Sequence, residues 1–83
     1  MNLFDQIFKD WDLRELIGWT EETIAELLES IKRGDCETFI IKSTGFELAA
    51  DELARRDPQA CEAWKAASLG ASPRPFFLES KYV

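Results

Sequence analysis

The sequence contains no histidine, two cysteines and four glycines, and these low counts exclude several kinds of chemistry. Without histidine there is no Ser-His-Asp or Cys-His nucleophilic system, no imidazole base and no histidine-containing zinc site. Cys36 and Cys61 are too few for a four-cysteine zinc site and are too far apart for a C-x-x-C motif. The glycines match no phosphate-binding or dinucleotide-binding spacing. We therefore expect no catalytic residue, no metal site and no cofactor, and predict that the protein is not an enzyme.

Long apolar runs are also missing. No segment approaches the roughly 18–20 apolar residues that a membrane-spanning helix needs. The first residues (MNLFDQIFKDWD) carry acidic side chains and lack the basic region of a secretory signal. We expect a cytoplasmic protein with no membrane partner, whose free thiols stay reduced and behave as small hydrophobes.

What the chain does have is enough apolar content for one core. It is 83 residues long, 46% hydrophobic, and contains three tryptophans. This length allows one domain, covering residues 1–83, and this composition argues against intrinsic disorder.

Acidic charge is concentrated in the first half. The net charge is −6, and residues 1–35 contain nine acidic and four basic residues. A phosphate backbone would be repelled by this half, so direct nucleic-acid binding is not expected. The charge favours a basic surface on another protein as the partner, or it serves only to keep a small domain soluble.

The segment from Trp19 to Gly34 carries a complete set of helix signals. Four large aliphatic residues recur at helical spacing, namely Ile24, Leu27, Leu28 and Ile31. Thr20 is placed to be the N-cap, and Gly34 is placed as the residue that ends the helix. We predict that the aliphatic stripe packs in the core.

Two segments have the composition of strands. Cys36–Lys42 (CETFIIK) is rich in β-branched and aromatic residues, and Phe76–Val83 (FFLESKYV) alternates in polarity. Ile40 and Ile41 would face opposite sides of a strand, so either both faces are covered or one isoleucine is an exposed contact. We predict that the two segments pair in a small sheet.

The remaining segments read as short helices. The first is 3–11, with an aromatic face, and the second begins at Asp12 and ends at Gly18. Thr44 opens a further helix through Arg56, and Asp57 caps a last helix over 58–69. The expected fold class is α+β: a mostly helical single domain of about four to five short helices with a two-stranded sheet, in the order α-α-α-β-α-α-β.

These features favour a small acidic protein-binding domain. By analogy of size and charge alone, it would act as phage anti-defence inhibitors and immunity proteins do, by occupying a basic, nucleic-acid-binding surface of its target. Two alternatives are an assembly subunit that self-associates through an edge strand or the aromatic helix, and a helix-turn-helix-like regulator. The predicted partner-binding residues are acidic side chains and two aromatics: Asp12, Glu15, Glu21, Glu22, Glu26, Glu29, Phe8 and Trp11.

Overall fold

The chain folds into helices joined by short turns. The computed structural model describes residues 7–68 and 71–80, and within these ranges it contains four helices and no strand. The helices are α1 (Leu13–Arg33), α2 (Cys36–Arg56), α3 (Pro58–Ala67) and α4 (Arg74–Ser80). The structure is therefore a helical bundle, and the predicted α+β class with a two-stranded sheet is wrong.

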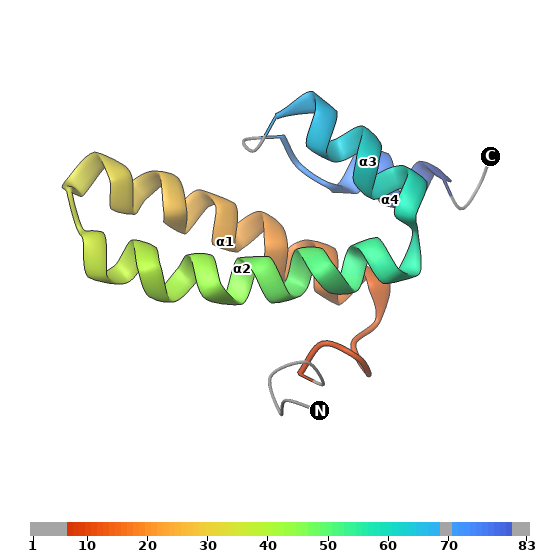
Figure 1. The fold of residues 1–83 in the computed structure, drawn as a ribbon, viewed down its shortest axis with the longest axis horizontal. Helices are drawn as coiled ribbons and strands as arrows, with labels where there is room; N and C mark the ends of the chain where they lie inside the picture. The colour runs from red at the N-terminus through yellow and green to blue at the C-terminus, as the bar shows by residue number, and fades with distance from the viewer. Residues whose placement is uncertain (1–6, 69–70, 81–83) are drawn as a thin grey trace.

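Two long antiparallel helices form the body of the molecule. Helices α1 and α2 run side by side from the turn between them, and α3 and α4 form a second, shorter layer (Figure 1). We call the pair α1 and α2 the hairpin. The second layer lies over the half of the hairpin that is farther from the α1–α2 turn, and the end that carries the turn projects beyond this layer (Figure 1). One end of the hairpin consequently has a covered face and the other does not.

Helix α1 is a single helix that passes through the predicted break at Gly18. One row of its positions recurs at alternating intervals of three and four residues: Leu13, Leu16, Thr20, Thr23, Leu27 and Ser30, all of them buried except the half-buried Leu27. Thr20 does not cap the helix; its buried hydroxyl donates to the carbonyl of Leu16 at 2.8 Å. A hydroxyl that bonds one turn back is satisfied inside a helix, so it does not have to mark an end. Gly34, by contrast, ends α1 with a φ of 69°, as predicted.

Helix α2 replaces both the predicted strand Cys36–Lys42 and the separate helix after Thr44. Asp35 opens it, because its carboxylate accepts from the backbone N–H of Thr38 at 3.1 Å and from the Thr38 hydroxyl at 2.7 Å. The Thr44 hydroxyl, predicted to be a cap, donates instead to the carbonyl of Ile40. A strong N-terminal cap and packing against α1 thus outweigh the local β-propensity of the isoleucines.

A glycine allows α1 and α2 to approach closely. A Cβ atom built on Gly45 would lie 3.0 Å from Cη2 of Trp19, tighter than most real Cβ contacts. The indole of Trp19 therefore lies across α2 at the one place where α2 has no side chain. Gly45 was predicted to lie in the first turn of a helix; in the structure it has a packing role in the interior of α2.

The second layer is held by a tryptophan. Asp57 caps α3 by accepting from the N–H of Ala60, and Pro58 is its first residue, as predicted. Nε1 of the buried Trp64 donates to the carbonyl of Ala71 at 2.7 Å, which fixes the connector that leads to α4. The predicted strand Phe76–Val83 is helical up to Ser80, and its last three residues lie outside the described part of the chain.

The segment before α1 crosses the end of the hairpin as a turn. Residues 7–11 are not helical, so the predicted helix over 3–11 is wrong over this segment; its residues 3–6 lie outside the described ranges. Phe8 is buried, with its ring 5.0 Å from that of Trp19. Arg56 donates to the carbonyl of Phe8 at 2.8 Å, and this bond ties the turn to the end of α2.

Candidate functional site

Two rows of large apolar side chains run along the face of the hairpin that carries the second layer. Ile17, Ile24 and Ile31 recur every seven residues in α1, and Leu53, Phe46 and Phe39 do so in α2. Because the helices are antiparallel, residues equally distant from Asp35 lie at the same level. The rows therefore make three levels, which we number from the covered end: Ile17 with Leu53, Ile24 with Phe46, and Ile31 with Phe39.

Exposure rises steeply from the first level to the third. Ile17 and Leu53 are 0% exposed and Ile24 is 8% exposed, but Ile31 is 61% and Phe39 is 36% exposed. The same kind of side chain is thus core at one end of the hairpin and surface at the other.

The second layer explains this gradient. The ring of Trp64 lies 5.8 Å from that of Phe46 and 5.9 Å from that of Phe77, which is fully buried in α4. These aromatic side chains cover the first two levels. They do not extend over Ile31 and Phe39.

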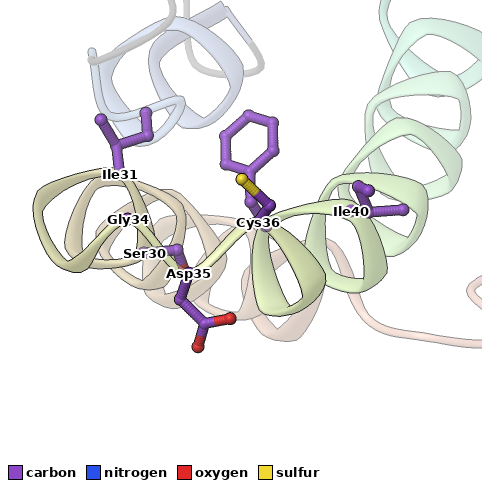
Figure 2. A pocket seen from close by; sticks show the side chains of 7 residues that line it. Ser30, Ile31, Gly34, Asp35, Cys36 and Ile40 are labelled. Atoms are coloured by element: carbon purple, nitrogen blue, oxygen red, sulfur yellow. The ribbon is translucent and has the colours of Figure 1, made fainter.

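The uncovered level opens into two neighbouring hollows. One is a groove of about 350 Å³ between α1 and α2, whose lining includes Leu27, Leu28, Ile31, Phe39 and Phe46. The other, of about 390 Å³, lies at the turn and shares Ile31 and Phe39. In Figure 2 the side chains of Ile31 and Cys36 project to the same side of the hairpin end, whereas the Asp35 carboxylate points the opposite way.

We call this region the hairpin-end surface and define it by four exposed apolar side chains: Leu28, Ile31, Phe39 and Ile40. The two other large apolar residues that are exposed in the described structure, Ile7 and Ile41, line another groove beside Trp11, which shares only Ile40 with the hairpin-end surface. Contiguous exposed apolar residues of this kind mark interaction sites more often than isolated ones do.

The acidic residues predicted to bind a partner are only partly brought together. Glu15, Glu22 and Glu29 recur every seven residues and form an exposed line along α1. Glu26 lies instead toward α2 and pairs with Lys42 at 2.8 Å. Asp12 is exposed immediately before α1.

Glu21 is part of the fold. Its carboxylate accepts from the Arg74 guanidinium at 2.8 Å and from the Ser72 hydroxyl, which joins α1 to the start of α4. The hydrogen bond from Arg74 holds the pKa of Glu21 below its ordinary value, although partial burial opposes this shift.

The two predicted aromatic contacts belong to the core and its edge. Phe8 is 5% exposed, and Trp11 is half-buried with its ring edge-on to Phe8 at 5.1 Å. The apolar surface that sequence reasoning missed consists of residues assigned to a core stripe or to a strand, in which one exposed isoleucine was an alternative prediction. Their signal was the seven-residue spacing of Phe39, Phe46 and Leu53, which mirrors that of the isoleucines in α1.

The hairpin-end surface carries little reactive chemistry. Its groove includes one carboxylate, Glu47, and one hydroxyl, Ser43, which donates to the carbonyl of Ile40 at 3.0 Å. Among the described residues, no cluster of three or more cysteine and acidic side chains is arranged to hold a metal ion. In the same part of the chain, no helix is both long enough and apolar enough to cross a membrane.

Comparisons with protein-family models, curated proteins and solved structures found no significant match to this chain.

Proposed function

We propose that this protein is a non-enzymatic protein-binding domain that attaches to another protein through the hairpin-end surface. The observation that carries the proposal is the exposure of Ile31 and Phe39 at the end of two rows whose other members are buried or, for Phe46, partly buried. Burying a side chain of this size contributes about 1.5–3 kcal/mol, and the fold leaves that gain unused at the third level.

The charge of the chain supports a basic partner. The net charge is −6, and Glu15, Glu22 and Glu29 form an exposed acidic line on the outer side of α1. The negative electrostatic potential of these groups raises the rate of association with a positively charged surface, and it contributes less to the final affinity. An acidic domain bound in this way covers a basic surface of its target, and so acts as an inhibitor where that surface binds nucleic acid.

The test compares two double variants with the wild-type protein in pull-downs from nuclease-treated lysate of the source cells. In the hairpin-end variant, Leu28→Ser and Ile31→Ser replace side chains that are 50% and 61% exposed. In the control variant, Ile7→Ser and Ile41→Ser replace side chains that are 46% and 63% exposed and lie in the other groove. Both variants therefore remove a similar amount of exposed apolar surface.

We expect a stoichiometric partner that the wild-type protein and the control variant retain and the hairpin-end variant loses. Reversing the charge of Glu15, Glu22 and Glu29 should slow its association and flatten the salt dependence of binding. A partner retained equally by both double variants would refute the assignment of the surface.

A further inference from the structure

The way in which the protein covers its own first two levels indicates which kind of partner segment binds the hairpin-end surface. This step rests on the proposed function and names the partner element. We infer that the surface binds one amphipathic α-helix of the partner, with large apolar residues on one face and lysine or arginine beside them.

The covered half of the hairpin supplies the first argument. There, the rows of Ile17, Ile24, Leu53 and Phe46 are covered by helices α3 and α4, whose inward-facing side chains include Trp64 and Phe77. The third level continues the same two rows with the same seven-residue spacing. The side chains of a helix fit the groove between two other helices, so an element of the same kind extends the second layer.

The dimensions set the length of the occupant. Adjacent levels are seven residues apart, which is about 10 Å along a helix. The groove reaches from Ile24 and Phe46 to Ile31 and Phe39, so it spans one such interval. About two turns of helix cover it, with apolar side chains at positions i, i+3 or i+4, and i+7.

The charges beside the groove argue for basic flanks. Glu47 lines the groove on the α2 side and is exposed. On the α1 side, Glu21 lines an adjoining hollow of about 250 Å³ together with Leu28, but its carboxylate is paired with Arg74, so Glu47 is the carboxylate that faces a partner. Lys32 lies farther toward the turn and is also exposed. A helix that places its bases beside Glu47 therefore meets opposite charge, and it approaches a protein whose net charge is −6.

The same charge argues against a second copy as the occupant. Two copies would bring together two domains of net charge −6, whose mutual repulsion opposes association. Self-association is accordingly a competing outcome of the test.

The experiment uses a displayed library of 18-residue helical peptides on an alanine-rich scaffold. Four positions on one face vary among leucine, isoleucine, methionine and phenylalanine, and four flanking positions vary among lysine, arginine, glutamate and serine. The library is selected on the full-length wild-type protein, with counter-selection on the hairpin-end variant. A library tests whether any amphipathic helix binds the surface, so the result does not depend on one designed sequence.

We expect enriched peptides with lysine or arginine at the flanking positions. Their affinity should fall at least tenfold in the hairpin-end variant and less than twofold in the control variant. Glu47→Lys should weaken them at least threefold, and the amide NMR signals that shift on binding should belong to residues 24–31 and 39–47.

Three results would overturn the inference. They are a library that yields no peptide dependent on Ile31, enrichment of acidic flanks, and a wild-type protein that dimerises through the same residues. If the lysate partner requires Leu28 and Ile31 but no helical peptide does, the protein-binding function stands and the helical occupant is wrong. If the partner binds equally well without the side chains of Leu28 and Ile31, the proposed function itself is wrong.

Discussion

Arg56 and Glu52 form a partly buried, hydrogen-bonded ion pair, with Arg56 Nε 2.8 Å from Glu52 Oε2. Arg55 donates to the other carboxylate oxygen at 2.9 Å, and Arg56 also donates to the carbonyl of Phe8. The Glu52 side chain is 8% exposed, so this carboxylate is neutralised and fully bonded where α2 meets the segment before α1. The pair fixes the end of the hairpin that lies farthest from the hairpin-end surface.

This arrangement predicts an acid-sensitive contribution to stability. Burial raises the pKa of the Glu52 carboxyl, but the hydrogen bonds from Arg56 and Arg55 outweigh it and bring the pKa below its ordinary value of 4.5. A carboxyl whose pKa is lowered on folding adds stability that is present above its unfolded pKa and is lost as the pH falls through its folded pKa.

Glu52→Gln should therefore lower the free energy of unfolding at pH 7 by about 1.5–3 kcal/mol, the usual value of hydrogen bonds to charged groups. The difference from wild type should narrow as the pH falls below 4.5, the ordinary value for this group. Urea unfolding at a series of pH values measures both effects. Asp51→Asn, at the exposed neighbouring position, serves as the control, and a pH-independent loss for Glu52→Gln would contradict this account.

Two helical glycines should respond in opposite directions to substitution. A Cβ added at Gly18 meets nothing within 4 Å, so Gly18→Ala should stabilise the protein by about 0.5–1 kcal/mol through reduced chain entropy. Gly45→Leu should destabilise it by about 1–3 kcal/mol, because the new side chain collides with Trp19. Thermal unfolding separates the two, and a stable Gly45→Leu variant would show that the close approach of Trp19 is wrong.

The two cysteines should differ in reactivity. Cys36 is exposed at the start of α2, whereas Cys61 is buried in α3 and burial raises the pKa of its thiol. A thiol-reactive dye should label one cysteine rapidly under native conditions and the second only on unfolding. Cys36→Ser should remove the fast phase, and rapid labelling of both thiols in the folded protein would contradict the packing of α3.

The three levels of the hairpin should differ in their effect on stability. Ile17→Ala, at the fully buried level, should cost about 2–5 kcal/mol of unfolding free energy. Ile31→Ala, at the exposed level, should change it by less than about 0.5 kcal/mol, as surface substitutions usually do. Denaturant unfolding of the two variants tests the gradient directly, and equal losses would mean that the third level is covered in the free protein.

The sequence predicted the ends of the helices better than their course. Gly34 and Asp57 were recognised as boundary residues, because side-chain caps and left-handed glycines act locally and leave a mark at one position. Asp12 also stands where α1 begins, but its side chain makes no capping hydrogen bond. The two long helices were missed because glycines and threonines in their interiors resemble boundaries. Gly45 and Thr20 are instead explained by contacts with residues on other turns or on the other helix.

The apolar run at Phe39, Ile40 and Ile41 shows a second limit. Local composition favours a strand at this segment, but packing against α1 stabilises a helix instead. Because helical and strand periods place different residues on one face, the wrong period also hid the alignment of Phe39 with Phe46. Glu15, Glu22 and Glu29 were named from the sequence as partner-binding residues. That they form a line apart from the hairpin-end surface could be seen only in the structure.

The central claim is that the hairpin-end surface serves binding and contributes little to folding. Its most direct test is to measure, for the Leu28→Ser and Ile31→Ser double variant, both the free energy of unfolding and the affinity for the captured partner. The account predicts an unfolding free energy within about 1 kcal/mol of wild type, since both side chains are largely exposed. It also predicts at least a tenfold loss of affinity that the Ile7→Ser and Ile41→Ser variant does not share. Wild-type affinity in the hairpin-end variant, or its unfolding, would contradict the claim.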